Sequence, residues 1–333
     1  MNPFETTPAD MAQRLSPAYL AKANELCLLP QPVMDILLPL AQRMAADARA
    51  VEALAGYSTE LLKVTRKSAP VNERLRALAE QRFDDTACMA EVLVMLAGAP
   101  SLHERNLNDG YPEELTAACL EDLALWLSDY HQRRGRWALF PGHTQWISNH
   151  FTGRLFKLGR LQFEFIEMGM DAKIVSKADG RHLSYRTGDT VLGVHIPAGP
   201  GMTPQACGDS VRRAKAFFPR YFPQKNPLAF HCSSWLLDPV LSKVLPKESN
   251  IAAFQRPFSL YKQLEESDAM WDRVFLLDDT NEKAPPPEVI AKLPRDTALR
   301  KALLEHVEAG GKLGGGTGIV PWDDVHLWEK LGV

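Results

Sequence analysis

The chain has 333 residues, enough for two domains, and its hydrophobic fraction of 45% and charged fraction of 24% are ordinary for a soluble globular protein. Its net charge of −3 gives no electrostatic basis for a nucleic-acid partner. No run of about 18 apolar residues could span a membrane, and the acidic N-terminus is unlike a secretory signal, so we expect no membrane partner. Five cysteines without a C-x-x-C pair favour a reducing cytoplasm and argue against a structural zinc site, so we expect no metal.

Residues 1–150 are predicted to form an all-helical domain. Met34, Leu37, Leu40 and Ala41 recur at the spacing of one helix face, with charged residues on the opposite side. Similar stripes occupy later segments up to about residue 135, and a hinge at Pro141-Gly142-His143 precedes one more helix. None of these segments carries a chemical motif, so we interpret their methionines and aromatic residues as core.

From residue 151 the hydrophobic period changes to that of strands. Leu161, Phe163 and Phe165 alternate with Gln162 and Glu164, as in a half-buried strand. Strands are also predicted at 173–177 and 182–185, joined by a hairpin turn at 179–180, and at 191–196. Four strands so close in sequence leave no room for parallel crossovers, which predicts an antiparallel meander.

The stretch that follows the 191–196 strand combines a Gly/Pro-rich turn at 197–201 with a capped helix. Thr203 is placed to be the N-cap, and Pro204 follows at the first helical position, where a missing N–H costs nothing. Such a turn aims backbone N–H groups outward at the positive end of the helix dipole, which describes either a phosphate cradle or an ordinary strand-to-helix turn. No Lys-Ser/Thr follows the glycines, which excludes a nucleotide-hydrolysing P-loop, and the spacing misses the dinucleotide fingerprint.

The rest of the chain is predicted to alternate strands and helices. Strands are expected at 228–232, 251–261 and 273–277, helices at 236–245 and 297–309, a loop at 283–287 and a flexible glycine turn at 314–316. The predicted fold class is therefore α+β: an all-helical N-terminal domain, 1–150, then a mixed, mainly antiparallel sheet flanked by helices, 151–333.

This order of elements resembles the GNAT acyltransferase fold. Four segments, LFKLGRLQFE (155–164), VHIPAG (194–199), HCSSWLLDP (231–239) and NIAAFQRPF (250–258), resemble the bacterial acyltransferase family that joins a helical N-terminal domain to a GNAT-like C-terminal domain. The resemblance implies acyl-CoA, with acetyl-CoA expected, as co-substrate and the amine of a small molecule or peptide as acceptor. It also implies that the CoA pyrophosphate lies on the turn, against Ile196, Pro197, Gly199, Gly201, Met202 and Thr203. The chain departs from the usual GNAT turn, Arg/Gln-x-x-Gly-x-Gly/Ala, by having Pro-Ala-Gly-Pro-Gly-Met there.

Transfer from a thioester to an amine requires a base for the amine and a proton donor for the leaving thiolate. Two candidates for the base are Glu164, which alternates away from the phenylalanines of its strand, and His195 near a strand end. At the end of the next strand, alternation separates His231 and Ser233 from Cys232 and Ser234. One of these pairs would meet the substrate, donate to the leaving sulfur or bind the acceptor, and the other would pack.

Further candidates for substrate binding are Arg160, His231, Trp235 and Arg256, with Trp235 as core or pocket wall and Arg256 on the surface or facing an acidic acceptor. Cys232 with His195 would instead make a nucleophile and base. Because Cys232 lies on a strand and not at a helix N-terminus, nothing obvious lowers the pKa of its thiol, and direct attack by the amine is preferred. Two alternatives stay open: a non-catalytic GNAT-fold module that binds CoA or another ligand, and a Cys232-dependent acyl-enzyme transferase or hydrolase.

Overall fold

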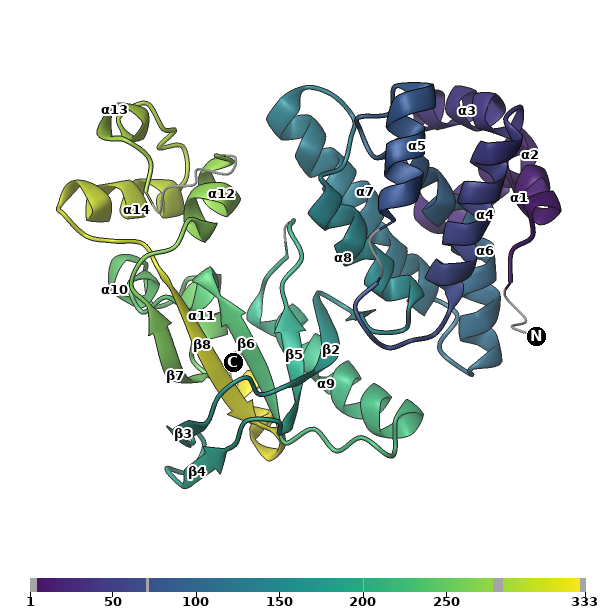
Figure 1. The fold of residues 1–333 in the computed structure, drawn as a ribbon. Helices are drawn as coiled ribbons and strands as arrows, with labels where there is room; N and C mark the ends of the chain where they lie inside the picture. Colours follow the sequence, from purple (N-terminus) through teal and green to yellow (C-terminus); the bar gives the residue numbers. More distant parts are fainter. Residues whose placement is uncertain (1–4, 70–71, 200, 278–283, 330–333) are drawn as a thin grey trace. The chain divides into compact units, whose positions relative to one another are not determined.

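The computed structural model describes residues 5–69, 72–199, 201–277 and 284–329 (Figure 1). The chain divides into two compact units, Met1–Lys157 and Leu158–Val333. Within the described ranges, no helix combines the length and the apolar character needed to cross a membrane.

The first unit is helical, as predicted. Its helices are α1 (Pro8–Arg14), α2 (Pro17–Cys27), α3 (Gln31–Ala45), α4 (Ala48–Leu62), α5 (Glu73–Phe83), α6 (Met89–Asn108), α7 (Leu115–Arg134) and α8 (Pro141–Phe151). Helix α6 packs against α2, α4 and α7, and its residues 89–99 are buried on every side. A helix that is apolar all round can be stable only inside a core, which explains why the other helices surround it.

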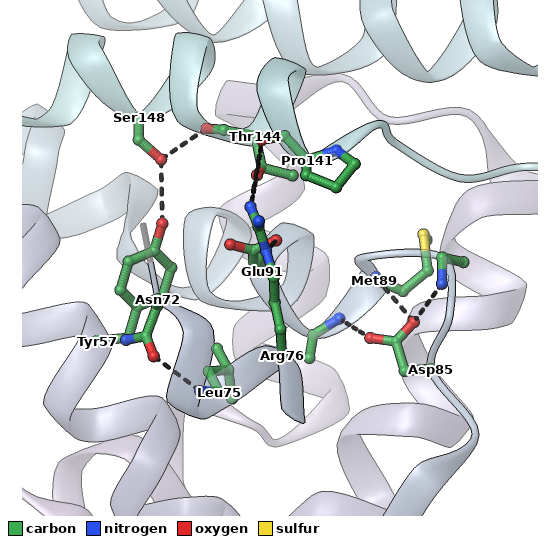
Figure 2. Close-up of polar contacts among 12 residues, drawn as sticks. Tyr57, Asn72, Leu75, Arg76, Asp85, Met89, Glu91, Pro141, Thr144 and Ser148 are labelled. Carbon is green, nitrogen blue, oxygen red and sulfur yellow. Dashed lines mark hydrogen bonds and ion pairs between the residues drawn. The ribbon is translucent and has the colours of Figure 1, made fainter. Parts of the chain in front are cut away.

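One acid interrupts the apolar face of α6. Glu91 is 1% exposed, and Arg76 of α5 donates a hydrogen bond of 2.9 Å from Nε to its Oε2 (Figure 2). The same guanidinium donates from Nη2 to Thr144 Oγ1 of α8, at 2.7 Å. A buried carboxylate requires a charged partner, so this ion pair links three helices of the unit.

A second buried polar group lies between α7 and α8. The His150 ring is fully buried, with Nε2 at 3.2 Å from Asp122 Oδ2 and Nδ1 at 2.9 Å from the Leu155 carbonyl oxygen. Burial lowers the pKa of His150, but Cys119 and Asp122 more than offset this and raise it to about 10. The imidazole is therefore protonated at neutral pH and forms an ion pair inside the helical unit.

The second unit is built on two sheets. The strands are β1 (Phe156–Leu158), which includes the boundary between the units, β2 (Leu161–Glu167), β3 (Ala172–Val175), β4 (His182–Tyr185), β5 (Thr190–His195), β6 (Ala229–Ser234), β7 (Ser259–Leu264) and β8 (Gly315–Pro321). The six-stranded sheet has the order β1-β2-β5-β6-β8-β7, and β3 and β4 pair in a sheet of two. The β5–β6 pair is parallel, whereas β2–β5, β6–β8 and β7–β8 are antiparallel. The fold class is confirmed: a helical unit precedes a mixed, mainly antiparallel sheet with flanking helices.

The predicted four-strand meander is wrong. β3 and β4 form the expected hairpin, but they leave the main sheet, and β2 pairs directly with β5. The apolar residues of the hairpin (Ala172, Ile174 and Tyr185) instead pack on Val191 and Ala229 of the main sheet. Period-2 patterning identifies strands without identifying their partners, because pairing depends on which face each strand buries.

The remaining helical elements of this unit are α9 (Pro204–Tyr221), η1 (Trp235–Leu237), α10 (Leu241–Val244), α11 (Asn250–Gln255), α12 (Ala269–Phe275), α13 (Pro287–Ile290), α14 (Ala298–Glu308), η2 (Trp322–Asp324) and α15 (His326–Glu329). Two predicted strands are therefore wrong: 251–261 is a helix, α11, followed by β7, and 273–277 lies mostly in α12. Ser249 caps α11 by accepting from the Ala252 N–H, a local signal that outweighs the aromatic content of this segment. Of the predicted loop at 283–287, Lys283 lies outside the described residues, and α13 begins at Pro287.

The predicted flexible turn at 314–316 is also wrong, because residues 315–321 form β8, an interior strand of the main sheet. The glycines are required by close packing: a Cβ on Gly314 would lie 1.9 Å from the Leu264 carbonyl oxygen, and one on Gly316 would lie 2.4 Å from that of Leu237. A glycine run here marks close approach of neighbouring backbone.

Candidate active site

One face of the main sheet is aromatic; the other, here called the polar face, carries polar side chains beside the apolar cluster that the β3–β4 hairpin covers. On the aromatic face, Phe163 and Phe165 of β2 contact Phe218 of α9, with ring centroids 6.4 and 5.0 Å apart, and Phe230 of β6 stacks on Trp322. Because side chains alternate along a strand, Glu164, His195 and His231 lie on the opposite, polar face. Helix α9 therefore covers the core side of the sheet and leaves these polar side chains on the other side.

Glu164 and His195 form a hydrogen-bonded pair on the polar face. The Glu164 Oε1 to His195 Nε2 distance is 2.9 Å, and the two residues come from neighbouring strands, β2 and β5. The side chain of Glu164 is 6% exposed and that of His195 is 33% exposed. The carboxylate therefore lies behind the imidazole, and only the imidazole is open to a reactant.

Strands β5 and β6 part next to this pair. Their paired residues are Leu192 with Phe230 and Gly193 with His231, whereas β5 continues to His195 and β6 to Ser234. Beyond that point β5 stays paired with β2, and β6 stays paired with β8. The sheet therefore opens between the carboxyl ends of two parallel strands, where polar groups of both strands are accessible.

A second hydrogen-bonded pair lies on the β6 side of this opening. The His231 Nε2 to Tyr261 Oη distance is 2.9 Å, and Tyr261 belongs to β7. Ser233 and Thr317 are likewise paired on this face, at 3.1 Å between hydroxyl oxygens. Tyr261 could not be identified as a site residue from the sequence. It is related to His231 only by its place on β7, which lies two strands from β6 in the sheet.

The Gly/Pro-rich turn and the start of α9 have the predicted cap. Thr203 Oγ1 accepts from the Ala206 N–H at 3.2 Å, with Pro204 at the first helical position. Gly201 has a φ of +85°, and space is open around its Cα where a side chain would project. The N–H groups of Met202, Thr203 and Gln205 have no acceptor in the described part of the chain. The turn and helix start can therefore offer three amides to an anion.

Arg160 holds this turn in place. Its Nη2 donates to the carbonyl oxygens of Pro197 and Gly199, at 2.8 and 3.0 Å, while its backbone N–H donates to Ser210 Oγ of α9. Together these bonds join the β1–β2 connection, the turn and the helix. The guanidinium also adds a positive charge beside the amides.

The other predicted residues lie elsewhere. Cys232 is on the aromatic side, 1% exposed, and burial raises its pKa to about 12. Ser234 accepts from the Leu236 N–H and caps η1. Trp235 packs against the core of α10, α12 and α14, and Arg256 is exposed after α11, bonded to the Lys247 carbonyl oxygen.

The fold is that of a class of enzymes, the GNAT-like acyltransferases. Family models match the chain over nearly its whole length: an N-acyltransferase N-terminal domain over residues 18–153 and a GNAT-like C-terminal domain over residues 155–320. The chain belongs to this family of two-domain acyltransferases, whose class of reaction is acyl-CoA-dependent acyl transfer.

Solved structures agree in fold. An acyltransferase in complex with decanoyl-CoA is 24% identical over 94% of this chain and 99% of that chain, with a TM-score of 0.63. An acyltransferase in complex with decanoyl-CoA and teicoplanin is 23% identical over 95% of this chain and 99% of that chain, with a TM-score of 0.62. An acyltransferase in complex with CoA and 10C-teicoplanin is 23% identical over 95% of this chain and 87% of that chain, also with a TM-score of 0.62. A comparison with curated proteins found no match.

Proposed function

We propose that the protein transfers an acyl group from acyl-CoA to the amine of a small molecule or peptide by direct attack of the amine on the thioester. The observation that carries this proposal is the Glu164–His195 pair on the polar face, beside the opening between β5 and β6. In the GNAT fold this opening receives the thioester, so a base here would adjoin the reacting carbonyl.

His195 is the base in this proposal and Glu164 orients it. With His195 Nε2 at 2.9 Å from the carboxylate, the neutral ring donates its Nε2–H to Glu164 and keeps Nδ1 as a proton acceptor. The amine nitrogen forms a bond to the thioester carbon, its proton passes to Nδ1, and the carbon–sulfur bond breaks to give the amide and free CoA. Glu164 stabilises the imidazolium that forms.

The turn after β5 fits the pyrophosphate of CoA. The three amides of Met202, Thr203 and Gln205 and the helix dipole of α9 favour a dianion, and Arg160 keeps the turn in this shape. Ile196, Pro197, Gly199 and Gly201 supply the backbone along which CoA would lie. Gly201, whose positive φ favours glycine, has no side chain to obstruct this path.

The acyl group is better assigned as medium-chain than as the acetyl group expected from the sequence. The basis is the decanoyl-CoA in two of the structures of similar fold. Teicoplanin, present in one of these complexes, supports an amine on a small molecule or peptide as acceptor. Cys232 has no role in this mechanism, because a buried, protonated thiol lacks the thiolate that a nucleophile needs.

The test combines binding with turnover. Acetyl-, octanoyl- and decanoyl-CoA are compared for the rise in Tm they produce, and CoA release is then followed with a panel of amines. We expect the largest rise and the fastest amine-dependent release with a medium-chain donor. Acyl-CoA binding without amine-dependent release would favour the non-catalytic module and refute the enzymatic proposal.

A further inference from the structure

The polar face carries a second histidine pair that the proposed base does not use. His231 and Tyr261 lie on the β6 side of the opening, and Glu164 and His195 lie on the β5 side. Acyl transfer needs two proton movements, one away from the amine and one toward the sulfur. The mechanism above has a residue for the first movement only.

The partner of each histidine determines which ring nitrogen carries the proton. The carboxylate of Glu164 can only accept, so His195 donates to it. The Tyr261 hydroxyl has no other hydrogen-bond partner in the described part of the chain, and a phenol is a stronger acid than a neutral imidazole. Tyr261 therefore donates to His231 Nε2, which leaves the proton of the neutral His231 ring on Nδ1. The two histidines thus have opposite tautomers: His195 carries its proton on Nε2 and can accept one at Nδ1, whereas His231 carries its proton on Nδ1 and can donate it.

The charge state of the second pair agrees with this arrangement. Burial and the nearby His195 lower the pKa of His231 to about 4, and burial raises the pKa of Tyr261. At neutral pH the pair is therefore an uncharged imidazole beside an intact phenol. An uncharged imidazole can release its proton readily only if it gains another at the same time.

We propose that Tyr261 and His231 form a proton relay that protonates the leaving thiolate of CoA. His231 Nδ1–H is transferred to the sulfur as the carbon–sulfur bond breaks, and the Tyr261 hydroxyl proton moves to His231 Nε2. The products are the CoA thiol and a transient tyrosinate, which takes back the proton from His231 Nε2 while His231 Nδ1 gains a proton from solvent, so that the starting tautomer is restored. This inference rests on the proposed function, because it assigns a residue to the second proton of that reaction.

The relay predicts that the need for Tyr261 depends on the leaving group. We expect Tyr261→Phe and His231→Gln to lower kcat/KM with acyl-CoA by about 10²-fold, since a general acid contributes that much to departure of an alkyl thiolate. With the acyl thioester of 4-nitrothiophenol, whose thiolate is stable without a proton, both variants should retain the parent's kcat/KM. Tyr221→Phe on α9, whose ring lies 4.7 Å from that of Phe217, is the matched control and should resemble the parent with both donors.

An equal loss with both donors, or no loss with acyl-CoA, would overturn the relay. The tautomer gives a second readout that needs no turnover: long-range ¹H–¹⁵N NMR should find His231 Nε2 unprotonated in the parent. A protonated Nε2 would refute the relay even if the protein transfers acyl groups. A parent that releases no CoA with any amine would refute the proposed function, whatever the tautomer.

Discussion

Replacing Glu164 by Gln tests the division of labour within the Glu164–His195 pair. The Glu164 side chain is 6% exposed and lies behind the His195 ring. The amide of glutamine has the same size and can occupy the same place, but it lacks the negative charge. In the ground state either the carboxylate of the parent or the amide oxygen of the variant can accept the hydrogen bond from His195 Nε2. The difference arises when His195 becomes imidazolium during attack, because only the carboxylate stabilises that charge.

The size of the effect follows from this geometry. A hydrogen bond to a charged group contributes about 1.5–3 kcal/mol in proteins. The His195 side chain is 33% exposed, so solvent weakens the interaction toward the middle of that range. A loss of about 2 kcal/mol in the transition state corresponds to about a 30-fold lower kcat. Since Glu164 lies behind the ring, KM for acyl-CoA should change little.

The assay is CoA release with a thiol reagent at saturating amine, with Glu167→Gln as matched control. Glu167 lies on the same strand but is exposed. His195→Ala should be more severe, lowering kcat by about 10²-fold or more, because it removes the base itself. A Glu164→Gln variant whose kcat matches that of Glu167→Gln would refute the reasoning. An unchanged rate in His195→Ala would exclude that residue as the base.

Four further predictions concern the turn, the buried thiol, the glycine strand and the buried ion pair. Gly201→Val should raise KM for acyl-CoA by about tenfold or more by blocking backbone approach, whereas Gly188→Val, with a similar φ of +91° and open surroundings, should not. Cys232→Ala should keep kcat and show no acyl-enzyme adduct by mass spectrometry, with a loss of about 1 kcal/mol in unfolding free energy; loss of turnover together with a trapped adduct in the parent would contradict direct attack. Gly316→Ala should lower the unfolding free energy by about 3 kcal/mol, measured with urea, because its Cβ meets a backbone carbonyl. His150 has its pKa raised to about 10 in the folded state, so its stabilisation is complete below the unfolded value near 6.5 and is lost as pH rises toward 10; His150→Gln should remove that part of the pH dependence of unfolding.

Features that depend on residues close together in the chain could be predicted from the sequence. Thr203 and Pro204 identified the start of α9, because a cap and a first-turn proline act within a few residues of themselves. Alternation separated Glu164 from Phe163 and Phe165, and so indicated which side chains leave the core. The family resemblance, carried by four short segments, gave the class of reaction and the order of the two units.

Pairing between distant strands could be decided only by the tertiary structure. The glycines at 314–316 predict a turn because a glycine run is flexible in isolation, and only the pairing of Gly315 and Gly316 with β6 and β7 makes them part of a strand. His231 and Tyr261 are thirty residues apart and meet because β8 places β7 two strands from β6. Which face a side chain occupies is a local property, but which side chain it meets depends on strand order, and strand order depends on how the whole chain buries its apolar surface.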